Sequence, residues 1–176
     1  MVVDSRVIAE VLLDDGRVDE AIRLVGPQQI AESWCRYTAL MDSDQPGEVR
    51  GRESPDFWAI YLWGCPEFWA DEERVRQGLL LLVDHAPDDG VLETVGAGPL
   101  EDFLRLDRRA VDPKQLEDRI GGIEAQAAGS PRFRQALAIV WTRALSKTQF
   151  DRLQAAAGVP LKPQSEPLRY TFRSDA

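Results

Sequence analysis

The chain has 176 residues, of which 44% are hydrophobic and 29% are charged, which is the composition of an ordinary globular domain. Its net charge of −9 argues against nucleic acid as a direct ligand, because attraction to phosphates requires a basic surface. The longest apolar run, Leu79 to Val83, is far shorter than the ~20 residues of a membrane span. The N-terminus lacks the features of a signal peptide, so a cytoplasmic protein with no membrane association is expected.

The first part of the chain has helical periodicity. Apolar residues recur at three- and four-residue spacing from Val3 to Leu12, which predicts an amphipathic helix that stops before Gly16. A short second helix should end at Gly26-Pro27, where the proline can open a third. No second copy of the pattern recurs at a period of ~34 residues, so a generic αα-hairpin is predicted. The polar segment 42–53 is predicted to be a surface loop.

Most aromatic residues fall in the next part of the chain. Ser54 and Pro55 predict the start of an apolar helix, and Pro66-Glu67 predicts the start of a long helix that ends at Ala86. Eight of the fourteen aromatic residues lie between Trp34 and Trp69, which indicates the main core. The alternative is that one or two indoles are exposed as anchors for a partner protein. The candidates for such anchors are Trp58, Trp63 and Trp69.

Residues 77–104 contain six acidic residues and no lysine or arginine. Asp88 is the predicted N-cap of a short helix that ends at Val95, and a tight Gly-Ala-Gly-Pro corner should follow. In this corner the first glycine is expected to be left-handed, the second to allow close approach, and the proline to open the next helix. The residues with these structural roles are Gly96, Gly98 and Pro99. Glu101 and Asp102 are expected in the first turn of the helix that follows the proline.

The remaining helices are delimited by serine, aspartate, proline and glycine. Asp112-Pro113 should start a helix that contains Gly121-Gly122, and Ser130-Pro131 should start one that reaches Leu145. Ser146 opens the last helix, which ends at Gly158. We therefore predict an all-α fold: one domain over residues 1–158, with about 8–10 short helices packed as αα-hairpins, with a solenoid-like stack as one arrangement of them. Residues 159–176 form an extended or partly disordered tail.

The segment Ala97–Leu104 resembles the Ala-Gly-Pro-Leu-Glu-Asp-Leu-Leu core shared by a bacterial family of unknown function. The resemblance extends over residues ~55–145, and residues 1–54 and the tail fall outside it. It takes in Trp58, Pro66-Glu67, residues 86–89, Ile123-Glu124, residues 131–137 and Val140-Trp141. It implies a small helical cytoplasmic protein with no established activity. By analogy, small standalone proteins of this kind often belong to toxin–immunity or inter-bacterial conflict systems.

Enzyme chemistry finds little support in the sequence. His85 is the only histidine, and its place at a predicted helix end favours capping or packing over catalysis. Cys35 and Cys65 have no metal-ligand spacing and are expected to be reduced thiols. No nucleotide-binding, hydrolase or zinc-protease motif is present, so no catalytic residue, metal or cofactor is predicted. A metal-dependent hydrolase remains an alternative, with carboxylates drawn from Asp84, Asp88, Glu93, Glu101 and Asp102.

Three functions follow from these patterns. The first is an acidic helical module that binds a basic protein, such as a toxin or effector that it neutralises by occlusion. The expected acidic contacts are Asp84, Asp88, Asp89 and Glu93. The second is the hydrolase, and the third is a homo-oligomeric scaffold joined through the surface of residues 57–69. A monomer or a homodimer is expected.

Overall fold

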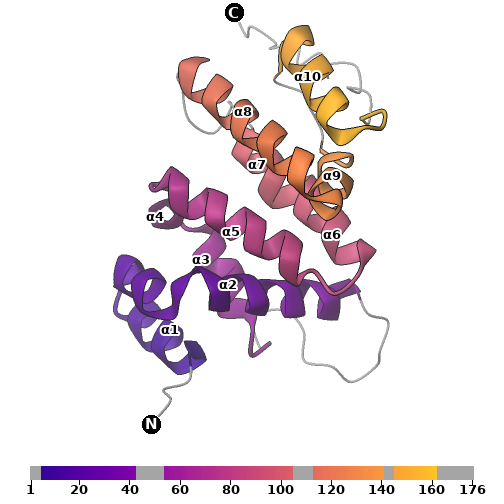
Figure 1. The fold of residues 1–176 in the computed structure, drawn as a ribbon. Helices are drawn as coiled ribbons and strands as arrows, with labels where there is room; N and C mark the ends of the chain where they lie inside the picture. The colour runs from indigo at the N-terminus through magenta and orange to yellow at the C-terminus, as the bar shows by residue number, and fades with distance from the viewer. Residues whose placement is uncertain (1–4, 43–53, 105–112, 141–144, 162–176) are drawn as a thin grey trace, which may run out of the picture.

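The computed structural model describes residues 5–42, 54–104, 113–140 and 145–161, and within these ranges every regular element is helical (Figure 1). The predicted all-α fold is confirmed. The elements are α1 (Ser5–Asp14), α2 (Val18–Asp42), α3 (Phe57–Gly64), α4 (Pro66–Trp69), α5 (Glu72–His85), α6 (Asp89–Val95), the π-helical turn η2 (Gly96–Leu100), α7 (Glu101–Leu104), α8 (Pro113–Gly129), α9 (Pro131–Leu137) and α10 (Lys147–Ala157). No helix in these ranges combines the length and apolar composition that crossing a bilayer requires.

Helices α1 and α2 form the predicted hairpin. Gly16 adopts the left-handed conformation, with φ of 70°, and the amide of Arg17 donates to the carbonyl of Leu12 at 2.7 Å. The predicted break at Gly26-Pro27 is also present, because Gly26 has φ of 80° and ψ of 157°. Helix α2 is therefore two helical segments that meet at a kink. The expected loop over residues 42–53 lies almost wholly outside the described residues.

The second half of α2 lies at the centre of the lower part of the molecule. Helix α2 packs against α3 and α5, and also against α6, so its contacts extend well beyond its neighbours in sequence (Figure 1). The apolar face that begins at Ile30 is buried at Ile30, Trp34 and Cys35, whereas Met41 at its far end is 42% exposed. Figure 1 shows α6 to α10 stacked above this layer, with α10 at the far end from α1.

Two predicted helix starts are displaced for local reasons. The long helix expected from Pro66 is divided, because Asp71 caps α5 by accepting a hydrogen bond from the amide of Arg74 at 3.1 Å. Helix α3 begins at Phe57 and not at Pro55. Asp56 stands at its N-cap without capping it, since the carboxylate instead pairs with Arg36 at 2.7 Å.

The predicted Gly-Ala-Gly-Pro corner is wrong. Gly96 has φ of −65° and ψ of −50°, so it is right-handed helical, and α6, η2 and α7 run on as one helix from Asp89 to Leu104. Pro99 has no amide hydrogen to donate, and the wider π turn accommodates it inside the helix. Because a π turn inserts one residue, it changes which face of the helix is buried. Both flanking segments therefore bury apolar side chains, namely Val91, Leu92, Val95, Leu100, Phe103 and Leu104.

The last helices follow the predicted signals more closely. Ser130 caps α9, Ser146 and Gln149 form a capping box on α10, and Gly158 ends α10 with φ of 71°. Helix α8 is continuous through Gly121-Gly122. Helix α9 ends at Leu137 and not at Leu145, and residues 141–144 are outside the described ranges. The predicted N-cap at residue 112 and most of the predicted tail, residues 162–176, are also outside them.

Candidate functional site

The four predicted acidic contacts lie together where α5 passes into α6. Asp84 is in the last turn of α5, Asp88 is the N-cap of α6, and Asp89 and Glu93 are one turn apart on α6. All four side chains are exposed. We call these four residues the acidic face.

Carboxylates elsewhere in the described chain are mostly held by cations. Arg152 binds both Glu117 and Glu124 at 2.6 Å, and Arg119 binds Glu72 at 3.1 Å. Asp84, Asp89 and Glu93 form no ion pair or side-chain hydrogen bond with a described residue, a state that they share with Asp14, Asp15, Asp19, Glu67 and Asp118. Other paired carboxylates are Glu10, Glu20, Asp56, Asp71, Glu73 and Asp151.

Local structure explains only half of the acidic face. Asp88 accepts a hydrogen bond from the amide of Val91 at 2.9 Å, and Asp89 is in the first turn of α6, where a negative charge favours the helix dipole. Asp84 is at the opposite end of a helix, where a carboxylate is unfavourable by about 0.3–1 kcal/mol. Glu93 caps nothing. Asp84 and Glu93 are therefore the two residues that the fold does not require.

Two cationic or titratable groups border the acidic face. Arg132, on α9, donates to the carbonyl of Val83 at 3.2 Å and also to that of Ala86, and so caps the C-terminus of α5. The Nε2 atom of His85 is 2.7 Å from the side-chain amide of Gln28 and 3.8 Å from Glu32. His85 thus packs at a helix end, as its position in the sequence predicted.

The tryptophans expected as surface anchors are mainly core residues. Trp58 and Trp63 are each only 5% exposed, so neither can present its ring to a partner in this structure. Trp63 lies over Gly78 so closely that a Cβ there would be 2.7 Å from the indole, and it contacts Phe68 at a tilt of 41°, with ring centroids 4.7 Å apart. Trp69 is half-buried, and its indole N–H donates to the carbonyl of Trp63 at 2.6 Å. The core interpretation therefore holds for Trp58 and Trp63.

The structural residues at the π turn act differently from what was expected. Close approach is made by Gly96, since a Cβ there would be 2.2 Å from the carbonyl oxygen of Ala136. Gly98 has open space around it, and its place before Pro99 favours a residue without a side chain in a helical conformation. Glu101 and Asp102 are both half-buried in the first turn of α7.

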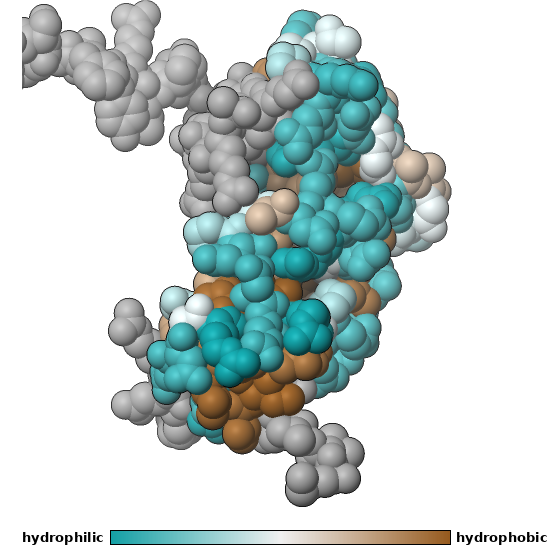
Figure 2. Space-filling model, turned by 90° about the vertical axis from the view of Figure 1, so that its left-hand side faces the viewer, coloured by the Kyte–Doolittle hydropathy of each residue, from teal (hydrophilic) through white to brown (hydrophobic). Residues whose placement is uncertain are grey.

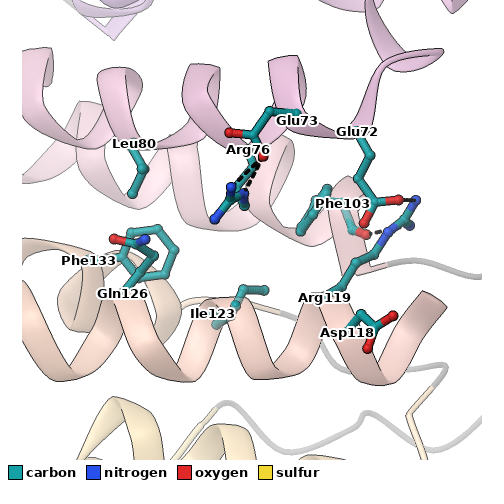
Figure 3. Close-up of a pocket in the computed structure, with 11 residues that line it drawn as sticks. Glu72, Glu73, Arg76, Leu80, Phe103, Asp118, Arg119, Ile123, Gln126 and Phe133 are labelled. Atoms are coloured by element: carbon teal, nitrogen blue, oxygen red, sulfur yellow. Dashed lines mark hydrogen bonds and ion pairs between the residues drawn. The ribbon is translucent and has the colours of Figure 1, made fainter. Parts of the chain in front are cut away.

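A cleft between α5 and α8 was not predicted. It has a volume of about 290 Å³ and combines an apolar floor with a charged mouth (Figure 3). Leu80, Phe103, Ile123 and Phe133 form the floor. The mouth carries the polar side chains of Glu72, Glu73, Arg76, Asp118, Arg119 and Gln126.

Arg119 ties three elements together at one end of this cleft. Its guanidinium donates to Glu72 at 3.1 Å and to the carbonyl of Phe103 at 2.9 Å, and it lies 4.9 Å from the centre of the Phe103 ring. Partial burial acts to raise the pKa of Glu72, but hydrogen bonds from Arg119 and Gln115 outweigh it and lower that pKa. Glu72 is thus held ionised. Residues 47 positions apart form this contact, which no local sequence pattern reveals.

The structure does not assemble the carboxylates of the hydrolase hypothesis into a metal site. In the described ranges, no three histidine, cysteine, aspartate or glutamate side chains are grouped so that they could hold an ion. The thiols are likewise separate and buried. Desolvation raises the pKa of Cys35 to about 12 and that of Cys65 to about 11, which keeps both protonated at neutral pH.

One comparison with known proteins gives a result. A family model matches residues 47–159, and it describes a family of unknown function. The match includes α3 to α10, and therefore the acidic face, the π turn and the cleft. Neither a curated protein nor a solved structure matches the chain.

Proposed function

The chain belongs to this family of unknown function, DUF6869, and we propose that it is an acidic module that binds a basic partner protein. The observation that carries the proposal is the state of the acidic face: Asp84, Asp89 and Glu93 are exposed and form no ion pair with a described residue. Asp84 also opposes the dipole of its own helix. Uncompensated charge that the fold does not need is available to a partner.

The physical mechanism is electrostatic steering followed by occlusion. A patch of like charges raises the rate at which a basic surface collides in the correct orientation, and this effect weakens as salt increases. Contacts around the patch then bury the partner's functional surface. We propose that the partner is a bacterial toxin or effector and that the chain is its cytoplasmic immunity protein.

The test of this function is neutralisation. The chain would be co-expressed with the product of the gene next to its own in the native host, and growth would be followed. The proposal expects that the neighbouring product inhibits growth alone and that the chain restores it. Restoration should be lost in the Asp84→Lys, Glu93→Lys double variant but kept in an Asp14→Lys, Asp15→Lys control. Asp14 and Asp15 are also exposed; Asp14 is the last residue of α1 and Asp15 follows it.

A homo-oligomeric scaffold is the second candidate, because apolar side chains are exposed near the N-terminal helices. Val7 and Val11 are one turn apart on α1 and are 51% and 55% exposed, and Tyr61 on α3 is 52% exposed. Figure 2 shows an apolar area at the foot of the molecule, where α1 lies in Figure 1. Light scattering at high concentration tests this candidate, and a monomer there would eliminate it.

A further inference from the structure

The cleft between α5 and α8 is unrelated to the charge of the acidic face and calls for its own explanation. We propose that it is a docking site for a short peptide segment of the partner, in which an apolar side chain is followed or preceded by lysine or arginine. This inference rests on the proposed function, since it takes the partner to be a basic protein. Its site is separate: Glu72 and Asp84 are twelve residues apart on α5, which is roughly 18 Å along the helix.

The size of the cleft suits a side chain better than a whole metabolite. Its volume of about 290 Å³ lies just below the range of small-molecule sites, about 300–1,000 Å³. Phe103, Ile123 and Phe133 are almost completely buried beneath it, so the floor is rigid core rather than a mobile surface. Apolar clefts of this kind accept the anchoring side chains that contribute most to protein interfaces.

The charges at the mouth select a basic segment. Five charged side chains line the cleft, and four of them neutralise one another in two ion pairs, Glu72–Arg119 and Glu73–Arg76. The fifth, Asp118, is exposed and pairs with no described residue. Figure 3 shows it on α8, beside Arg119. A ligand therefore meets one uncompensated negative charge next to an apolar floor, which is complementary to an apolar side chain beside a cation.

The other end of the cleft can hold a peptide backbone. Gln126 lines the cleft there, and its amide has no hydrogen-bond partner among the described residues (Figure 3). An unengaged amide offers both a donor and an acceptor, as one peptide unit requires. Asp118 and Gln126 are eight residues apart on α8, so roughly 12 Å separates the two polar ends. That length corresponds to about four extended residues.

Adjacent glycines on α8 provide a matched pair of variants. Gly122 lines the cleft, whereas Gly121 does not, and a Cβ added at either position meets no heavy atom within 4 Å. Leucine at position 122 should fill the cleft without displacing the fold. Leucine at position 121 makes the same chemical change beside it. Both replace a glycine inside a helix and should not weaken it.

The experiment is a titration of the ¹⁵N-labelled full chain, observed by amide NMR. The probes are the synthetic peptides acetyl-Lys-Leu-Phe-Arg-amide, acetyl-Glu-Leu-Phe-Glu-amide and acetyl-Lys-Ser-Ser-Arg-amide. Shifts at Gly122, Ile123 and Gln126 are expected with the first peptide, and binding roughly tenfold weaker with the other two. Gly122→Leu should abolish these shifts, Gly121→Leu should preserve them, and Asp118→Asn should weaken binding of the basic peptide several-fold.

Three results would overturn the inference: no cleft shifts with the basic apolar peptide, equal binding of the acidic peptide, or unchanged binding by Gly122→Leu. The amide spectrum of each variant reports directly whether it folds, and Asp118→Asn tests the site independently of the glycines. Shifts confined to Asp84, Asp89 and Glu93 would reject the cleft and leave the proposed function intact. Cleft shifts with a failed neutralisation test would reject the proposed function instead.

Discussion

Gly96 lies so close to Ala136 that a methyl group on its Cα would be 2.2 Å from the Ala136 carbonyl oxygen. This contact fixes the distance between the helix that contains the π turn and α9. Since Phe103 belongs to the same continuous helix, it also helps to place the floor of the cleft.

We expect Gly96→Ala to destabilise the protein by about 1–3 kcal/mol, because the new methyl group meets a backbone atom that no rotamer change can move. Urea denaturation measures the change. The matched control is Gly121→Ala, which meets open space inside α8 and should stabilise by about 1 kcal/mol. Equal effects of the two substitutions would show that the close contact has no energetic importance.

Substitution of Asp84 should change protein stability and partner binding in opposite directions. Asp84→Lys places a favourable charge at the C-terminus of α5, so the free energy of unfolding should rise by about 0.3–1 kcal/mol at low salt. The same substitution should weaken association with a basic partner. Urea denaturation and a binding titration on the same sample check both effects. A variant that loses stability, or that binds as well as the parent, contradicts the role given to Asp84.

The thiols should be inert in the folded protein. Burial raises the pKa of Cys35 to about 12 and that of Cys65 to about 11, so the reactive thiolate is scarce at pH 8. Ellman's reagent should therefore react slowly with the native chain. Once denaturant is added, it should react rapidly with both cysteines. Immediate release of one equivalent from the native protein would place a thiol at the surface.

The attachment of α10 to α8 should weaken at acidic pH. Hydrogen bonds from Gln149 and Arg152 lower the pKa of Glu117, and those from Arg152 lower the pKa of Glu124. Because both folded-state values lie below the ordinary 4.5, this stabilisation is complete above pH 4.5 and is lost as pH falls through the folded values.

The corresponding variant is Arg152→Ala. As the pH is lowered beneath 4.5, the urea concentration at the unfolding midpoint of the parent should decrease. The midpoint of Arg152→Ala should be lower than that of the parent at neutral pH and should decrease less over the same pH interval. Lys147→Ala is the control, since it removes only an exposed pair with Asp151 within α10. Parallel pH profiles for the parent and Arg152→Ala would exclude the ion pairs of Arg152 with Glu117 and Glu124 as a source of stability.

Features that depend on residues close together along the chain could be predicted from the sequence, and features that depend on residues far apart along the chain could not. The caps at Asp88, Ser130 and Ser146 were correct because a cap bonds to an amide three residues away. The corner at Gly96 was wrong because the need for glycine there comes from Ala136, forty positions along the chain.

The candidate sites divide in the same way. Exposure of Asp84 and Glu93 was foreseeable from their polarity, but their lack of partners could be established only from the folded arrangement. The cleft was missed because the contact between Glu72 and Arg119 joins residues from separate helices. Trp58 and Trp63 could not be sorted from exposed aromatics, since helical periodicity is uninformative where a helix is apolar on all sides.

The central claim is that the acidic face recognises a basic protein, and the association rate constant tests it most directly. It would be measured by stopped flow with the purified neighbouring-gene product, at low and high salt. For Asp84→Lys, Glu93→Lys, we predict a rate roughly tenfold or more below that of the parent at low salt, converging with it at high salt. The Asp14→Lys, Asp15→Lys control, with the same net charge, should stay near the parent rate. Equal slowing of both variants would show that only net charge matters and would contradict the acidic face.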